Sequence, residues 1–178
     1  DSLVDCSIYV ASATGRPCSV TVENPVLGNS ITRYIQGSRS SVITIPNSWV
    51  YLRNPSINAQ NKGVRIYSTD TIVVWSTNFG YYSLDATTLL PTPILADEYV
   101  VQTYPPPVFH GSNYRSSIAI VATENNTTVR VTPSVSIFAD TVRQAGTALT
   151  FSMSKGQSVY LRSVGANAAG DLSGTLNR

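Results

Sequence analysis

The most regular feature of the sequence is an alternation of apolar and polar residues with a period of two, carried mainly by β-branched and aromatic side chains. This alternation is typical of strands that bury one face. Turn residues recur about every eight to twelve positions, the spacing expected in a sandwich or barrel. No window of helical length shows a sustained 3.6-residue period. The pattern predicts an all-β fold of the β-sandwich type, with strands at 6–9, 19–22, 41–45, 63–67, 71–75, 117–121, 128–132, 148–153 and 158–162.

Two stretches, 78–97 and 104–115, lack this rhythm and are rich in proline, glycine and aromatic residues. They are predicted to be long ordered loops, which are uncommon in a domain unless they serve a purpose. Exposed aromatic side chains on such loops are candidate binding contacts. The alternative is that the loops cap the open ends of a sandwich with their own aromatic residues. The candidate binding residues are Tyr81, Tyr82, Tyr104, Phe109 and Tyr114.

An internal duplication is indicated when residues 7–67 are laid over residues 117–178. The offset stays near 110 throughout, too long for a solenoid repeat and suited to a duplicated β-module. We therefore expect two related β-modules, residues 1–115 with the two long loops and residues 116–178 as a partial second copy. The matched pairs are 7–11 with 117–121, 20–22 with 129–131, 42–45 with 149–152 and 63–66 with 174–177.

The second copy lacks one strand of the first. In the first module, the strand at 63–67 is followed by the strand at 71–75, which is its expected hairpin partner. The second copy contains no equivalent of that partner, and unpaired strand groups cost free energy unless they are covered. We expect either that the chain is a piece of a longer one or that another chain supplies the strand by β-edge pairing.

The composition limits the classes of partner. Charged residues make up 12% of the 178 residues, against roughly 25% in an average soluble protein, while 42% are hydrophobic, which is enough for a sizeable core. The net charge is +2 and the basic residues are scattered, so nucleic-acid binding is not indicated. The longest apolar runs are too short to span a bilayer. The expected partners are other protein chains, either copies of the same chain or a continuation of the same precursor, joined by β-edge pairing, with glycans as a further class.

Cys6 and Cys18 are the only cysteines. A metal site would need more ligands, and the single histidine, His110, lies far along the chain. The two cysteines stand near the ends of two predicted strands, where they could face each other across a hairpin. A structural disulfide is predicted, which implies an oxidising compartment and a secreted protein. Two buried thiols are the alternative.

Asn125 and Asn126 begin two overlapping acceptor sequences for N-glycosylation. An Asn-Asn pair between two strands also predicts a tight hairpin turn, because asparagine tolerates positive φ. Both interpretations are compatible, since the tip of a hairpin is exposed, and the presence of a glycan is left open.

No constellation of residues indicates catalysis. His110 would have to act as the base of an acyl-transfer triad, but it lies in a proline-rich stretch and no Gly-x-Ser-x-Gly sequence is present. Half of the acidic residues available for glycoside hydrolysis lie at predicted turns. Calcium on Asp85, Asp97 and Glu98 is a further alternative that no ligand spacing supports. We expect no enzyme activity, no cofactor and no metal.

The residues at 62–78, 82–86, 90–91, 98–101, 122–133, 155–157 and 171–175 resemble, in order and spacing, the signature of the IgG Fc-binding protein N-terminal domain family. The resemblance covers the chain from about residue 40 to the end and departs from the signature at Thr71-Ile72 and at Asn177. It implies a secreted, non-enzymatic structural or adhesive module that mediates protein–protein association in extracellular matrix, mucus or fibres. The alternative is a lectin-like extracellular domain that binds a glycan or a host protein. Binding to an antibody Fc belongs to particular members and does not follow from these motifs.

Overall fold

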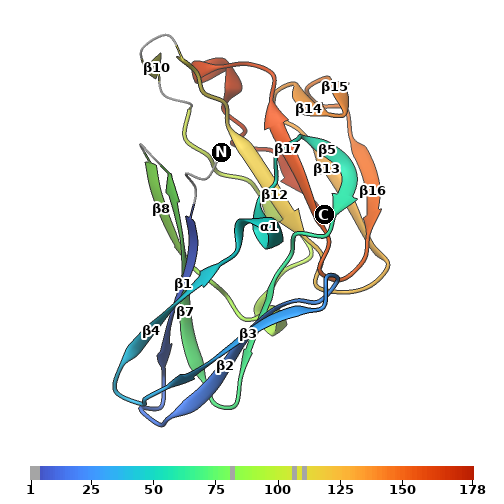
Figure 1. Ribbon diagram of the computed structural model, residues 1–178. Helices are drawn as coiled ribbons and strands as arrows, with labels where there is room; N and C mark the ends of the chain where they lie inside the picture. Colours follow the sequence, from blue (N-terminus) through green and yellow to red (C-terminus); the bar gives the residue numbers. More distant parts are fainter. Residues whose placement is uncertain (1–4, 81–82, 106–107, 110–111) are drawn as a thin grey trace. The chain divides into compact units, whose positions relative to one another are not determined.

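The computed structural model describes residues 5–80, 83–105, 108–109 and 112–178 and divides into two compact units. Unit 1 comprises Asp1–Tyr51 and Asn61–Leu95, and unit 2 comprises Leu52–Gln60 and Ala96–Arg178. Both units are built almost entirely of antiparallel strands, which confirms the predicted all-β fold (Figure 1). The module limits expected from the duplication, 1–115 and 116–178, stay a prediction.

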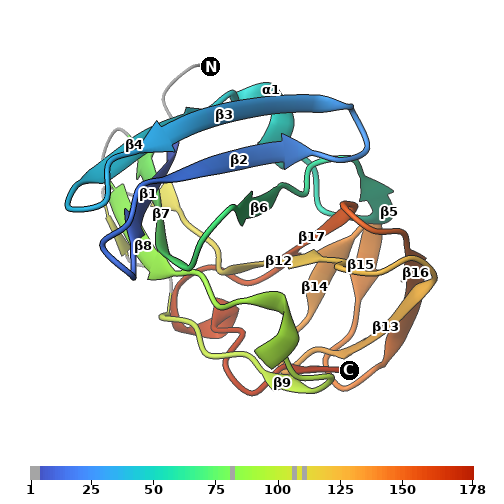
Figure 2. The same ribbon diagram turned by 90° about the horizontal axis from the view of Figure 1, so that it is seen from below.

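Unit 1 is a sandwich of two sheets with the strand orders β4-β1-β7-β8 and β3-β2-β6. The strands β2, β3 and β6 can be followed side by side in Figure 2. A four-residue helix follows β4, and a short 3-10 helix follows β8. The elements of unit 1 are β1 (Asp5–Ser12), β2 (Cys18–Asn24), β3 (Asn29–Ile35), β4 (Ser40–Ile45), α1 (Asn47–Val50), β6 (Arg65–Ser68), β7 (Ile72–Gly80), β8 (Ser83–Thr88) and η1 (Thr92–Ile94).

The core of unit 1 follows directly from the alternation in its strands. Ile8 and Val10 of β1 face the interior, and they meet the buried side of β2, which carries Val20 and Val22. Because side chains alternate between the two faces of a strand, every second residue of each strand enters this core. The buried residues are Ile8, Val10, Cys18, Val20, Val22, Ile35, Ile43, Ile45, Trp49 and Val74.

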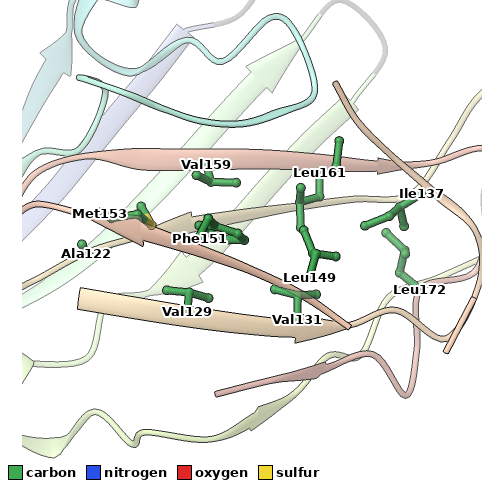
Figure 3. Close-up of a cluster of buried hydrophobic side chains, with 11 residues drawn as sticks. Ala122, Val129, Val131, Ile137, Leu149, Phe151, Met153, Val159, Leu161 and Leu172 are labelled. Carbon is green, nitrogen blue, oxygen red and sulfur yellow. The ribbon is translucent and has the colours of Figure 1, made fainter. Parts of the chain in front are cut away.

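Unit 2 is a second sandwich, whose sheets have the orders β12-β17-β14-β15, with β5 also paired to β17, and β16-β13-β18-β9. Figure 3 shows Met153, Phe151 and Leu149 of one strand packed with residues of the neighbouring strands. The elements of unit 2 are β5 (Ser56–Gln60), β9 (Tyr99–Val100), β10 (Val108–Phe109), β11 (Ser112–Asn113), β12 (Ser117–Val121), β13 (Thr127–Thr132), β14 (Ile137–Ala139), β15 (Thr141–Arg143), β16 (Leu149–Met153), β17 (Ser158–Ser163), η2 (Asn167–Gly170) and β18 (Leu176–Asn177).

The two units repeat one order of strand pairing. In unit 1, β1 pairs with β4, and β2 pairs with β3 and β6. In unit 2, β12 pairs with β17, and β13 pairs with β16 and β18. The counterpart of β16 is therefore β3 rather than β4, so the expected match of residues 42–45 with 149–152 is wrong by one strand. The sequence match failed there because two strands with the same alternation look alike.

Several expected hairpins are connections between the two sheets instead. β1 and β2 lie in different sheets, as do β12 and β13, and β6 and β7. The strand β7 pairs with β1, so the expectation that it is the hairpin partner of β6 is wrong. Alternation determines which face of a strand is buried. It is compatible both with two strands paired in one hairpin and with two strands that lie in facing sheets and are joined by a short turn.

The stretch 78–97 was expected to be a loop, and this is wrong for its first half. β7 extends to Gly80, and β8 pairs with it over six residues, from Trp75 opposite Thr88 to Gly80 opposite Ser83. β8 is an edge strand whose described side chains are exposed, so it needs no apolar face and gives no strong alternation. The stretch 104–115 contains only the two-residue strands β10 and β11 as regular structure among its described residues.

The segment Leu52–Gln60 interrupts unit 1 in sequence and belongs to unit 2. β5 pairs with β17, and Ile57 and Ala59 pack against the core of unit 2. Asp140, which has a φ of 67°, holds the segment: its carboxylate accepts hydrogen bonds from the Ile57 N–H at 3.0 Å and from Asn58 Nδ2 at 3.3 Å. Hydrogen bonds to the Asp140 carboxylate lower its pKa, and the bond from the Ser56 side chain has the largest effect. Nothing in the alternation pattern indicated this pairing.

Candidate functional site

The outward face of the β4-β1-β7-β8 sheet of unit 1 carries a group of exposed apolar side chains. In the register of the sheet, Val42 lies opposite Tyr9, and Tyr9 lies opposite Trp75. Residues directly opposite each other in an antiparallel pair project from the same face, so these three side chains form a row across three strands. We name the unit 1 outer face by its six apolar residues: Tyr9, Val42, Val73, Trp75, Phe79 and Leu84.

This surface is substantially accessible to solvent. Trp75 is 39% exposed and Leu84 is 66% exposed. Hydroxyl side chains lie between the apolar rows, where Ser7 Oγ and Thr44 Oγ1 are 3.4 Å apart. Over the described strands of this sheet, the outward positions hold no lysine or arginine. Aromatic enrichment together with few charges is the composition of the central part of protein–protein interfaces.

The outward face of the other sheet of unit 1 has a different chemistry. Arg65 Nη1 lies 3.5 Å from Glu23 Oε1, and its guanidinium lies 5.0 Å from the centre of the Tyr67 ring. Thr21 and Thr32 are joined by a hydroxyl hydrogen bond of 2.9 Å. These charged and hydroxyl groups are satisfied by one another, as on an ordinary solvated face. This face also carries two exposed tyrosines, Tyr34 and Tyr67, against six exposed apolar residues on the unit 1 outer face.

The five loop aromatics that were predicted to bind differ in whether the structure describes them and in where they lie. Tyr81 and Tyr82 lie outside the described residues. Phe109 belongs to β10, paired with β11. Tyr104 is 92% exposed, and its carbonyl accepts a 3.0 Å hydrogen bond from Ser116 Oγ.

Tyr114 is also exposed, and it precedes Ser116 by two residues, so Tyr104 and Tyr114 lie on neighbouring segments of unit 2. The predicted binding role of the loop aromatics stays a prediction. The unit 1 outer face was missed: alternation with buried neighbours places the Tyr9 and Trp75 side chains outward, but only the strand register brings them together.

Both cysteines are thiols in the structure. Cys18 is buried in β2, and Cys6 of β1 is partly buried against the same core cluster. They lie in facing sheets of one sandwich rather than across a hairpin. Burial raises the pKa of the Cys6 thiol. The disulfide is not formed in the structure, and its formation in the native protein stays a prediction.

Asn125 and Asn126 occupy the turn between β12 and β13, and both are exposed. Asn126 has a φ of 59°, in the left-handed region that asparagine tolerates. Asn125 Oδ1 accepts a hydrogen bond of 3.2 Å from the Lys155 N–H. The expected turn is therefore present, although it joins two sheets instead of forming a hairpin, and glycosylation stays a prediction.

The segment Asp171-Leu172-Ser173-Gly174-Thr175, which carried part of the family resemblance, has a structural role. Asp171 Oδ1 accepts hydrogen bonds from Thr103 Oγ1 at 2.8 Å and from the Ser173 N–H at 2.9 Å. These bonds, with that of the Ser173 N–H foremost, lower the pKa of Asp171. Gly174 has a φ of 83°, and Leu172 and Thr175 are fully buried. The motif fastens the segment before residue 104 to the sandwich of unit 2.

The described part of the chain offers little for a metal ion or a small ligand. In that part of the chain, no group of three or more His, Cys, Asp or Glu side chains is placed to hold a metal ion. His110, the only candidate base, lies outside the described residues. A hollow of about 70 Å³ is lined by Arg130, Thr132, Leu176 and Arg178, which is small beside the ~300–1,000 Å³ of typical ligand pockets. Over the same described residues, no helix has the length and apolar character needed to cross a membrane.

These features define a class of protein: an all-β chain of two sandwiches whose most prominent exposed chemistry is an aromatic sheet face. The chain belongs to the IgGFc-binding protein family, because residues 85–176, more than half of its length, match the family described as "IgGFc binding protein". This match confirms the resemblance found in the sequence, and it includes the Asp171–Thr175 motif. Searches among curated proteins and among solved structures returned no match.

Proposed function

We propose that the protein is a non-enzymatic, secreted adhesive module that binds other protein chains through the unit 1 outer face. The observation that carries this proposal is the row formed by Val42, Tyr9 and Trp75 on a sheet face without lysine or arginine. Apolar patches of this kind on soluble proteins mark interaction sites. Membership of a family described as binding the Fc part of immunoglobulin G supports a protein partner.

The spread of this surface over three strands favours a protein partner over a small molecule. A three-strand row of Val42, Tyr9 and Trp75 offers ring surface and branched aliphatic surface with few rotatable bonds, so binding costs little side-chain entropy. The hydroxyl groups of Ser7, Thr44 and Thr77 lie in the next row and could satisfy polar groups of a partner. Copies of the same chain are the first partner to test, since they present this surface to one another.

The test compares the full chain with a Tyr9→Ser/Trp75→Ser double variant. Sedimentation velocity over a range of concentrations measures self-association, and biolayer interferometry with immobilised immunoglobulin G Fc measures the second partner. We expect association with at least one of these two probes, weakened about tenfold or more in the double variant, as is typical when central aromatic contacts are removed. Tyr34→Ser is the matched control, because Tyr34 is an exposed tyrosine on the other sheet of unit 1. Absence of binding to both probes, or equal binding by the double variant, would contradict the proposal.

The second candidate function is recognition of a glycan by the aromatic residues of the predicted loops. The observation that favours it is the nearly complete exposure of Tyr104 on a segment fastened by Ser116 and by the Asp171 network. Screening the chain on a glycan array, with Tyr104→Ala as the variant and Tyr67→Ala as an exposed control, decides this alternative. Retention that is lost only in Tyr104→Ala would favour the glycan function.

A further inference from the structure

One edge of the sheet that contains β12 is open. β12 pairs with β17 on one side, and among the described strands none pairs with it on the other. Edge strands in soluble proteins are usually guarded by lysine, proline or a covering segment, because an open edge pairs with other chains. The five residues of β12 include neither lysine nor proline and carry no charge.

The register shows which backbone groups face the open side. The Ala122 N–H donates to the Gln157 carbonyl at 3.0 Å, so at even-numbered positions the chain is bonded toward β17. Hydrogen-bonded and non-hydrogen-bonded positions alternate along an antiparallel pair. The N–H and C=O groups of Ser117, Ala119 and Val121 therefore point away from β17, toward the open edge.

The counterpart edge in unit 1 is occupied. There β1 pairs with β4 on one side and with β7 on the other, along eight residue pairs. The Ala13 N–H donates to the Thr71 carbonyl at 2.9 Å, so odd-numbered positions of this strand are bonded toward β7. The offset of 110 carries odd positions of β1 onto odd positions of β12. The backbone groups that β7 satisfies in unit 1 are the ones left open in unit 2.

Burial agrees with this correspondence. Ile8 and Val10 of β1 are 2% and 0% exposed, with β7 beside them. Their counterparts Ile118 and Ile120 pack against the core of unit 2 but stay partly exposed. In unit 1, Val74 of β7 lies opposite Val10 and shields it. An added strand would shield Ile118 and Ile120 in the same way.

We propose that the open edge of β12 is an acceptor for a β-strand delivered by a polypeptide other than a copy of this chain, whose own β7 is already paired with β1 and β8. The strand runs antiparallel to β12 and has the alternation of β7, with a branched apolar residue opposite Ile120 and a small residue opposite Ile118, as Val74 and Ser76 stand opposite Val10 and Ile8. Main-chain bonds to Ser117, Ala119 and Val121 supply affinity, and the half-covered isoleucines supply selectivity for uncharged strands. The site lies within unit 2 and does not depend on the unit 1 outer face.

The test uses the full chain and a synthetic peptide with the sequence of residues 71–78. Hydrogen–deuterium exchange resolved to single residues is measured with and without the peptide. We expect exchange at Ser117, Ala119 and Val121 to slow by about tenfold or more, as for amides newly placed in a sheet. The control peptide carries Val74→Asp, which places a charge opposite Ile120 and is expected to give no slowing.

One protein variant and one modified peptide distinguish backbone pairing from non-specific association. Ala119→Pro removes an N–H that faces the open edge, a position where a strand tolerates proline, and is expected to keep the pairing with β17 while abolishing the peptide effect. A peptide N-methylated at Val73 and Trp75 tests the same bonds on an unaltered protein and is expected to be inactive. Equal slowing by all peptides would overturn the proposal. Slow, concentration-dependent exchange at these amides without peptide would also overturn it, because it would assign the edge to a second copy of the chain.

Discussion

Asn24 is the most connected buried polar side chain of unit 1, and its removal gives a quantitative test of the fold. The residue is fully buried at the end of β2. Its Nδ2 donates to the Trp49 carbonyl at 3.3 Å and to the Asn61 carbonyl at 3.0 Å. Its Oδ1 accepts from the N–H groups of Val26 at 3.1 Å and Leu27 at 2.9 Å. One side chain thus joins the β2–β3 turn to two other segments of the unit.

Asn24→Ala removes all four bonds at once. Each bond contributes about 1 kcal/mol net, and a buried group left unpaired costs about 1–3 kcal/mol. Val26 and Leu27 are exposed, so water can satisfy their N–H groups, whereas Trp49 is buried. We therefore expect the free energy of unfolding of unit 1 to fall by about 2–4 kcal/mol. With a urea slope of about 1–1.5 kcal/mol per molar, the urea midpoint falls by roughly 1–4 M.

The assay can be restricted to unit 1. Both tryptophans of the chain, Trp49 and Trp75, belong to that unit, so tryptophan fluorescence during urea unfolding reports on it alone. Asn29→Ala is the control, because Asn29 pairs with Asn24 in the register but is exposed. A loss below about 0.5 kcal/mol, the range of ordinary surface substitutions, would refute the assignment of Asn24 as the central junction.

Asn24→Asp sharpens the test through pH. The carboxylate still accepts from Val26 and Leu27, but it has no proton for the carbonyls of Trp49 and Asn61, so burial raises its pKa in the folded state. A raised folded pKa means that the stabilising protonated form is present at low pH and lost as the pH rises through that pKa. The free energy of unfolding of the variant should therefore be closer to that of the natural chain at pH 4 than at pH 7. A difference in unfolding free energy that does not change with pH would contradict the geometry.

Three further outcomes are expected. Hydrogen bonds lower the pKa of Asp171, so the stability that its carboxylate gives unit 2 is present above the ordinary aspartate pKa of about 3.9 and is lost as the pH falls through the folded value. Asp171→Asn should therefore have a lower free energy of unfolding than the natural chain at pH 7, and the difference should shrink in acid. Circular dichroism during urea unfolding measures it. After secretion from a eukaryotic host, Asn126 should carry the glycan, since the Asn125 side chain is held by the Lys155 N–H; Asn126→Gln should abolish a mass shift that Asn125→Gln preserves. In secreted material, Cys6 and Cys18 should resist alkylation until a reductant is added, and a native protein alkylated at both after denaturation alone would exclude the disulfide.

The strands with one buried face were predictable from the sequence. β4, β12 and β13 lie where the alternation predicted them, because burial of every second residue is a local property of the chain. Which strands pair was not predictable in the same way. β7 follows β6 directly but pairs with β1, since a short connection is compatible both with a hairpin and with a crossing between sheets. β5 and β8 were missed because pairing with β17 and β7, rather than an apolar face of their own, makes them strands.

The candidate surface was missed for a related reason. Tyr9 was correctly placed on a strand, and its alternation with Ile8 and Val10 already sets it on the outside. Its importance depends on its neighbours, however, because only the register brings Val42 and Trp75 beside it. A row across three strands is a property of pairing between segments more than 30 residues apart, which a single sequence does not reveal.

The excursion of Leu52–Gln60 into unit 2 makes the polypeptide pass between the units three times, after Tyr51, after Gln60 and after Leu95. A protease that cuts at the last of these passages would divide the chain into the peptides 1–95 and 96–178. β5 belongs to the first peptide, but it is paired with β17 and packed against the core of unit 2 in the second. In an ordinary two-domain chain, a single cut in the linker separates the domains. Here the two pieces should stay associated after the cut, because β5 of the N-terminal piece is part of unit 2.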